Sequence, residues 1–197
     1  MQIIAGLGNP GGQYAGNRHN VGFQTLDAIQ HHWALTPWRK RFSAQTSEGA
    51  IETASGPVRL LLIKPQTFYN ESGRAIGEAA RFYKVAPGEI TVFHDELDLA
   101  PGKFRLKTGG GHAGNNGLRS TMAHLDGEFR RGRIGIGHPG DKSRVTGWVL
   151  SDFPKADQGW ADALKDAIAR SLPLLLENAE DAFQTRVTHL APAPDRD

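Results

Sequence analysis

The sequence contains no cysteine among its 197 residues. This absence excludes disulfide bonds, thiolate zinc sites, iron–sulfur ligation and a thiol nucleophile. No apolar run approaches the ~20 residues of a membrane span. The first residues, MQIIAGLGNP, carry no basic stretch ahead of an apolar one, which a secretory signal would need. We therefore expect a soluble cytoplasmic protein without membrane contact.

Several catalytic signatures are also missing. There is no Walker loop, no GxSxG nucleophile elbow and no HExxH zinc motif. Gly6, Gly8 and Gly11 match the spacing of the dinucleotide fingerprint. However, Pro10 and Gly12 prolong a loop where that fingerprint needs a helix, and no acid follows a second strand. A nucleotide-dependent enzyme is therefore an alternative that this loop disfavours.

Short apolar runs alternate with amphipathic segments, which predicts an α/β fold: a single-domain, three-layer fold with a twisted mixed β-sheet flanked by helices. Strands are expected at 3–7, 58–63, 90–93, 103–106 and 133–137. Helices are expected at 21–33, at about 72–83 and from about 160 to 175. The last of these should kink or break at Pro173. One domain should span 1–190, followed by a flexible tail at 191–197.

Charge is unevenly distributed along the chain. The formal net charge is +2, but residues 101–150 carry nine basic and three acidic side chains, together with 12 of the 24 glycines. Residues 151–197 carry five basic and nine acidic side chains. A basic, glycine-rich segment predicts contact with a polyanion, and the alternative is a loop-rich solvated surface.

One histidine and one carboxylate are candidates for acid–base chemistry. His19 stands at the entry to the first expected helix, and a histidine that acts as a general base needs a partner to fix its tautomer. Asp95 follows the buried strand 90–93, at the sheet edge where α/β proteins bind ligands. We interpret them as a pair. A metal site in the HDELD segment and a solvated acidic turn are the alternatives.

Three asparagines, Asn9, Asn70 and Asn116, each stand in a loop that follows an apolar segment. Neutral amides suit the holding of a carbonyl or a developing oxyanion. Cations gather in the basic segment, which predicts a phosphate site, with solvated strand edges as the alternative. They are Lys103, Arg105, Lys107, Arg130, Arg131 and Arg133.

Five ordered motifs carry a resemblance to a known family: GLGNPG with RHN, KPQTFYNESG, HDELDL, GGGHAGNNGLRS and RIGIGHPGDKSRVTGWVL. Between residue 3 and about residue 153, the sequence strongly resembles bacterial peptidyl-tRNA hydrolases. The resemblance implies a single, monomeric α/β domain without metal or cofactor. It also implies an enzyme that cleaves the ester between a peptide and the 3′-terminal ribose of tRNA, so that peptidyl-tRNA is its partner and free tRNA returns to translation.

The same resemblance implies roles for individual residues. His19 matches the catalytic histidine, Asp95 the aspartate that supports it, and Asn9 an asparagine at the reacting centre. The substrate's 3′ end and peptide would contact Tyr14, Tyr69, Asn70 and Asn116, and the tRNA phosphate would contact Arg105, Lys107 and Arg133.

The sequence departs from the family pattern at three places. Tyr69 stands where many members have methionine, and Asn115 where many have histidine. Lys107 and Thr108 form a short insertion, so the sequence does not decide which cation contacts the phosphate. An RNA-binding factor without hydrolytic activity is the remaining alternative function.

Overall fold

The computed structural model describes residues 1–196. Within that range the chain forms seven β-strands and six α-helices, joined in part by short 3-10 helices. The strands are β1 (Gln2–Gly6), β2 (Arg39–Arg41), β3 (Ala44–Thr53), β4 (Gly56–Pro65), β5 (Ile90–Glu96), β6 (Phe104–Thr108) and β7 (Arg130–Gly135). The α-helices are α1 (Val21–His32), α2 (Ser72–Tyr83), α3 (Asn116–Leu125), α4 (Val145–Val149), α5 (Lys155–Leu176) and α6 (Glu180–Leu190). The 3-10 helices are η1 (Gly12–Tyr14), η2 (Arg18–Asn20), η3 (Tyr69–Glu71), η4 (Pro87–Glu89) and η5 (Lys142–Arg144).

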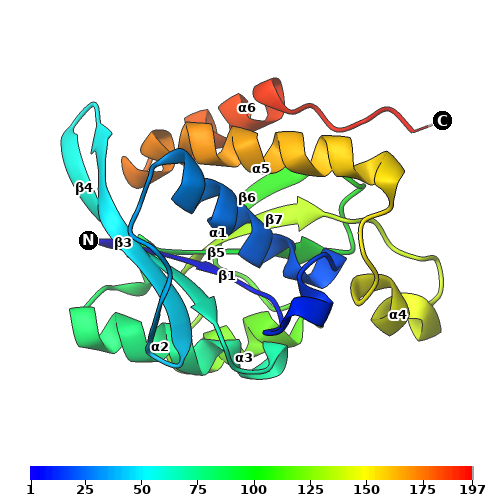
Figure 1. Ribbon diagram of the computed structural model, residues 1–197, viewed down its shortest axis with the longest axis horizontal. Coiled ribbons are helices and arrows are strands. Elements are labelled where there is room, and N and C mark those ends of the chain that lie inside the picture. Colours follow the sequence, from blue (N-terminus) through cyan, green and yellow to red (C-terminus); the bar gives the residue numbers. More distant parts are fainter. Residues whose placement is uncertain (197) are drawn as a thin grey trace.

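The strands form one mixed sheet in the order β2-β3-β4-β1-β5-β7-β6. Strands β4, β1, β5 and β7 are mutually parallel, while β2, β3 and β6 pair antiparallel with their neighbours. Helices α1 and α5 cover one face of the sheet, and α2 and α3 cover the other (Figure 1). The predicted three-layer α/β fold is thereby confirmed.

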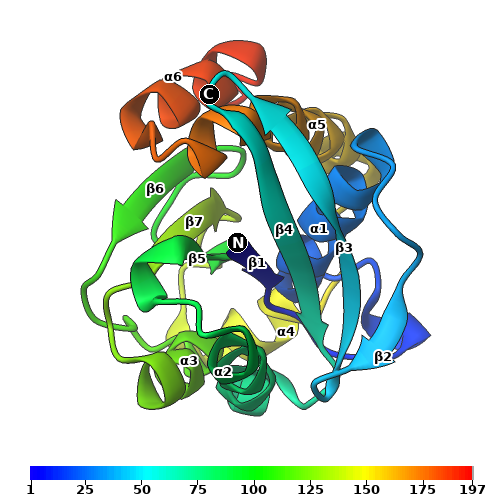
Figure 2. The ribbon, with the colours of Figure 1, turned by 90° about the vertical axis from the view of Figure 1, so that its left-hand side faces the viewer.

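Each face of the sheet packs against its own hydrophobic core. Ile4 and Leu62 belong to the cluster on the α1 and α5 side, whereas Ile3 and Leu61 belong to the cluster under α2 and α3. Because neighbouring side chains in a strand point to opposite faces, a sheet that is covered twice requires continuous apolar runs. Figure 2 shows this sheet between its two helical layers.

Two glycines allow α1 to lie directly against the sheet. A Cβ atom on Gly6 would lie 2.4 Å from the carbonyl oxygen of Gly22, and a Cβ atom on Gly22 would lie 2.5 Å from the amide nitrogen of Leu7. Only glycine permits so close an approach of two backbones. The contact fixes the start of α1, which directly follows the segment that carries the candidate residue His19.

Two local expectations are corrected by the structure: the end of the strand at Phe93 and a break of the helix at Pro173. Strand β5 does not end at Phe93 but continues to Glu96, and Asp95 in it is buried, so the HDE segment is no solvated turn. Helix α5 runs through Pro173 without a break. A proline lacks the N–H that would bond the carbonyl four residues earlier, and here the Trp33 indole N–H donates to that Ala169 carbonyl at 2.8 Å.

The segment after α6 returns to the start of α5. Ala191 is buried, and Arg196 forms an ion pair with Asp157 at 2.8 Å. Asp197, the end of the expected tail, lies outside the described residues, and the domain limits at 190 stay a prediction. Among residues 1–196, no helix combines the length and apolarity needed to cross a membrane.

Candidate active site

The candidate residues lie at the carboxyl-terminal edge of the parallel strands. Asn9 follows β1, Asn70 follows β4 on η3, and Asp95 is the penultimate residue of β5. His19 reaches the same edge from η2. In open α/β sheets this edge is where ligands bind, because the loops there converge from several strands.

His19 and Asp95 form a hydrogen-bonded pair. The His19 Nδ1 atom lies 2.8 Å from Asp95 Oδ2. The Asp95 side chain is 3% exposed and that of His19 is 18% exposed. The carboxylate is therefore enclosed by protein, while the imidazole is partly exposed to solvent.

Electrostatics fix the tautomer of the histidine. Burial alone would raise the pKa of Asp95, but the adjacent His19 and the hydrogen bonds from His19 and Tyr69 lower that pKa below its ordinary value. An ionised carboxylate can only accept hydrogen bonds, so His19 Nδ1 carries the proton. In the neutral imidazole, the lone pair of Nε2 is then free to accept a proton from a bound molecule.

Tyr69 lies behind the pair, with only 6% of the residue exposed. Its ring stacks on the His19 imidazole, with 3.6 Å between ring centroids and 14° between ring planes. Its hydroxyl oxygen lies 2.9 Å from Asp95 Oδ1 and 3.0 Å from Asn115 Nδ2. Burial, followed by the nearby Asp95 charge, raises the pKa of Tyr69 well above its ordinary value. The hydroxyl thus stays protonated and donates to Asp95.

Asn9 is held in one orientation by two neighbours. The side chain of the buried Asn20 accepts a hydrogen bond from the Asn9 backbone N–H and donates one to the Asn9 backbone carbonyl, both at 2.9 Å. The Tyr69 backbone N–H donates to Asn9 Oδ1 at 3.2 Å. Because an N–H can only donate, the oxygen of the Asn9 side chain faces Tyr69, which leaves its NH₂ group as the donor available to a ligand.

The other predicted substrate contacts occupy different positions. Asn70 lies on η3 and Asn116 is the first residue of α3, and both side chains are exposed. Tyr14 ends η1 and is half-buried. Among residues 1–196, no hydrogen bond joins the Tyr14 hydroxyl to His19 or Asp95. The exposed amides are open to a bound substrate, and the substrate roles of all three residues stay predictions.

The predicted phosphate contacts gather on β6 and β7. Arg105 and Arg133 are directly paired across these antiparallel strands. Lys107, two residues beyond Arg105, shares its face of the sheet and is exposed. Arg133 forms an ion pair with Glu96 at 2.9 Å, whereas Lys107 projects from the edge strand. The three cations therefore lie in one stripe, and Arg133 already has an anionic partner within the protein.

Two further arginines of the basic segment are buried and serve the fold. Arg131 donates to the backbone carbonyls of Gly110 and Gly111, which fixes the glycine-rich loop. Arg130 donates to Gln2 Oε1 at 2.7 Å and to the Leu175 carbonyl at 3.2 Å. These guanidinium groups are therefore not part of a phosphate site.

Arg18, the residue before His19, is 4% exposed and joins η2 to the segment after α4. Its guanidinium lies 3.7 Å from the centroid of the Trp148 ring and donates to Ser151 Oγ at 2.6 Å and to the Asp152 carbonyl at 3.1 Å. Asn17 Nδ2 adds a hydrogen bond to Asp152 Oδ1 at 2.7 Å. The loop that carries His19 is thus fixed on both sides.

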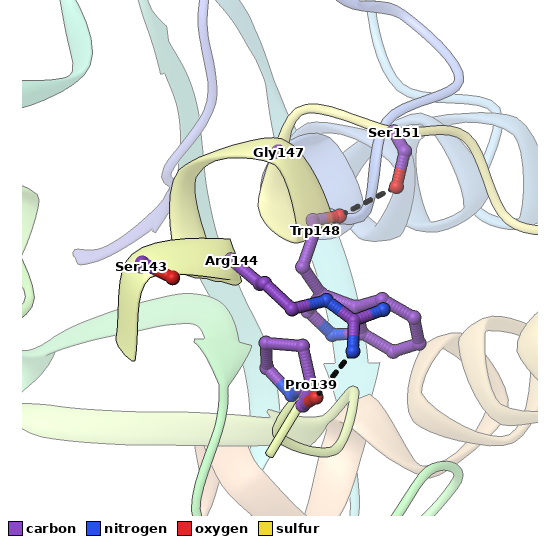
Figure 3. A pocket seen from close by; sticks show the side chains of 6 residues that line it. All are labelled: Pro139, Ser143, Arg144, Gly147, Trp148 and Ser151. Carbon is purple, nitrogen blue, oxygen red and sulfur yellow. Dashed lines mark hydrogen bonds between the residues drawn. The ribbon is translucent and has the colours of Figure 1, made fainter. Parts of the chain in front are cut away.

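A hollow of about 360 Å³ is bordered by Trp148 and Ser151, among other residues (Figure 3). Arg144 lies beside the Trp148 ring and donates to the Pro139 carbonyl at 3.4 Å. None of the candidate residues lines this hollow, so it is separate from the His19 site. Its lining residues are Pro139, Ser143, Arg144, Gly147, Trp148 and Ser151.

Arg18 and Asn20, which flank His19 in the RHN motif, support its loop but were not among the residues predicted from the sequence. The contact between Tyr69 and Asn115 was not predicted either.

The alternative of a metal site in the HDELD segment has no set of donor residues, since no three His, Cys, Asp or Glu side chains within residues 1–196 converge as ligands. His94 is buried, and its Nδ1 donates to the Asp95 carbonyl at 2.8 Å.

The profile of the peptidyl-tRNA hydrolase family matches residues 3–194. The chain belongs to this family. The peptidyl-tRNA hydrolase of Maricaulis maris is 60% identical over 195 residues, which cover 99% of this chain and 96% of that protein. The peptidyl-tRNA hydrolase of Hyphomonas neptunium is 56% identical over 197 residues, covering 100% and 95%. The crystal structure of peptidyl-tRNA hydrolase from Acinetobacter baumannii matches with a TM-score of 0.90 and 38% identity, over 98% of this chain and 97% of that one.

Membership of the peptidyl-tRNA hydrolase family confirms the resemblance stated from the motifs. The chain is accordingly an enzyme that hydrolyses peptidyl-tRNA. This finding favours hydrolysis over both alternatives raised from the sequence, the nucleotide-dependent enzyme and the RNA-binding factor.

Proposed function

We propose that His19 and Asp95 form the general-base pair with which this chain hydrolyses the peptidyl-tRNA ester. The observation that supports this most directly is the 2.8 Å contact between His19 Nδ1 and the buried Asp95 carboxylate. In the neutral imidazole, that contact places the proton on Nδ1 and leaves the Nε2 lone pair as the acceptor for a proton from water, as a general base requires.

The reaction then proceeds in two proton transfers. His19 Nε2 removes a proton from water, and the oxygen of that water attacks the ester carbonyl carbon. The Asn9 side-chain NH₂ donates to the resulting oxyanion, while Asn70 and Asn116 hold the substrate. The bond to the ribose oxygen breaks as His19 returns the proton to that oxygen. The products are a peptide carboxylic acid and free tRNA.

Substitution His19→Ala tests the pair. General-base catalysis supplies about 10²–10⁴-fold in rate, so the turnover of N-acyl-aminoacyl-tRNA should fall by that factor while tRNA binding stays unchanged. His31→Ala, an exposed position on α1, is the control and should leave turnover unchanged. Near-wild-type turnover in the His19→Ala variant would refute the assignment. A monomer that acts in the cytoplasm stays a prediction from the sequence.

A further inference from the structure

Asp95 has two carboxylate oxygens, and they have different partners. His19 Nδ1 lies at Oδ2, and the Tyr69 hydroxyl lies at Oδ1, at 2.8 Å and 2.9 Å. A carboxylate with one bound oxygen can rotate about its Cβ–Cγ bond, whereas two bonds on opposite oxygens fix its plane. The orientation of the carboxylate toward His19 thus depends on the tyrosine.

The tyrosine hydroxyl is itself fixed by a third residue. Its proton is committed to Asp95, so its oxygen accepts from Asn115 Nδ2 at 3.0 Å. The orientation of that amide is determined at its other end, because Asn115 Oδ1 accepts from the Leu118 backbone N–H at the start of α3, also at 3.0 Å. An unbroken series of hydrogen bonds therefore runs from the first turn of α3 to the His19 imidazole.

Tyr69 contacts the two other candidate groups as well. Its ring stacks on the His19 imidazole, and its backbone N–H orients the amide of Asn9. A residue that is 6% exposed offers little surface to a substrate. Its contacts point inward, to His19, Asp95 and Asn9, and not to the open side of the site.

We infer that Tyr69, with Asn115, is a positioning residue that sets the orientation of Asp95 and, through it, of His19, and is not a substrate contact as the family resemblance implied. This inference rests on the proposed function of the His19–Asp95 pair. It assigns to this chain a four-residue series, Asn115–Tyr69–Asp95–His19. A methionine at the position of Tyr69 has no hydroxyl to donate to Asp95, so a chain with methionine there would not form this series.

Tyr69→Phe removes only the hydroxyl and keeps the ring that stacks on His19. We expect kcat for N-acyl-aminoacyl-tRNA to fall about tenfold, with KM unchanged, because the loss affects the alignment of the base and not the binding of substrate. The matched control is Tyr83→Phe, which removes a hydroxyl that accepts from Arg41 at 2.6 Å on the opposite end of α2 from η3. It should leave both constants unchanged.

A double-mutant cycle separates positioning from a general structural role. If the hydroxyl acts through the carboxylate, Tyr69→Phe should change kcat less than twofold when Asp95 is already Asn. A tenfold further loss in the Asp95→Asn background would overturn the inference, and so would a Tyr69→Phe enzyme whose KM rises while kcat is kept.

Asn115→Asp provides a second variant. Aspartate caps a helix as well as asparagine does, so the start of α3 and the melting temperature should be preserved. The new carboxylate can only accept, so it competes with Asp95 for the tyrosine proton, and kcat should fall severalfold. Full activity in both Tyr69→Phe and Asn115→Asp, with His19→Ala inactive, would refute the inference alone. An active His19→Ala would refute the proposed function instead.

Discussion

Replacing Gly22 by alanine should push helix α1 away from the sheet. A Cβ atom there would lie 2.5 Å from the Leu7 nitrogen, 2.5 Å from the Phe93 carbonyl oxygen and 2.6 Å from the Leu7 oxygen. All three are backbone atoms of β5 or of the residue after β1, so no change of rotamer relieves the overlap. The helix must move outward by about 0.5 Å or more, as overpacked cores do.

The size of the effect follows from this displacement. Overpacking costs typically ~1–3 kcal/mol in free energy of unfolding. At ~2 kcal/mol, and roughly 2–4 °C per kcal/mol for a domain of this size, the melting temperature should fall by about 4–8 °C. His19 moves with the start of α1, and a displacement of about 1 Å in a reacting group can reduce the rate ~10²-fold. We therefore expect kcat to fall at least about tenfold.

Gly159→Ala is the matched control. Gly159 also lies in a helix, but a Cβ atom added there would meet no neighbouring element within 4 Å. There the alanine should raise stability by about 0.5–1 kcal/mol. The assays are thermal unfolding followed by circular dichroism and cleavage of N-acyl-aminoacyl-tRNA. A Gly22→Ala enzyme that melts and cleaves like the wild type would refute the reasoning.

Three further predictions concern charge. The pKa of Asp95 is lower in the folded than in the unfolded chain, so its carboxylate stabilises the fold above about pH 4, and this contribution is lost as the pH falls through the folded-state value. In urea unfolding, the difference in free energy of unfolding between wild type and Asp95→Asn should therefore become smaller from pH 6 to pH 3. A constant difference would contradict this. Arg18→Met should lower the free energy of unfolding by about 3 kcal/mol, since a desolvated cation–π contact and charge-assisted hydrogen bonds are lost together. If calorimetry shows the free energy of unfolding to fall by less than about 1 kcal/mol, these contacts contribute little to stability. Replacing Arg105 and Lys107 by alanine should weaken tRNA binding and reduce the slope of the logarithm of the binding constant against the logarithm of the salt concentration by ~0.7–0.9 per lost phosphate contact. Short ester substrates should be cleaved normally. Arg170→Ala on α5 is the control, and an unchanged slope in the Arg105 and Lys107 variant would show that tRNA binds elsewhere.

Much of the fold and part of the site could be predicted because the signals are local. Aliphatic runs such as Leu60–Ile63 are typical of strands covered on both faces, and turn residues after them indicate where the loops begin. Since parallel strands present their carboxyl ends at one edge, placing His19 and Asp95 together needed only the order of the elements.

The remainder depends on tertiary partners that a local pattern does not contain. The polar residues His94, Asp95 and Glu96 favour a turn on propensity, yet they continue β5 in its pairing with β7. Within this strand the Tyr69 hydroxyl and His19 bond the Asp95 side chain, and Arg133 bonds that of Glu96. The beginning of α3 is hidden in a glycine- and asparagine-rich stretch.

One local signal at α3 could have been used. Asn115 precedes apolar residues at helical spacing, Leu118, Met122 and Leu125, which is typical of a helix N-cap. The joint role of Tyr69 and Asn115 has no such signal, because the two residues are far apart in sequence and only the folded chain brings them into contact.

The bonds of Arg18 and Asn17 to residues 151 and 152 also limit how early during synthesis the His19 loop can be fixed. The partners in these contacts are 133 to 135 positions apart in the chain. A ribosome delivers the chain from its N-terminus, so the His19 loop waits for about three quarters of the protein before it can close. Shorter nascent chains hold His19 and Asp95 without the contacts that fix the loop. The His19 loop can therefore be fixed only once residues 151 and 152 have been delivered, at a point where α5 and α6 are still to follow.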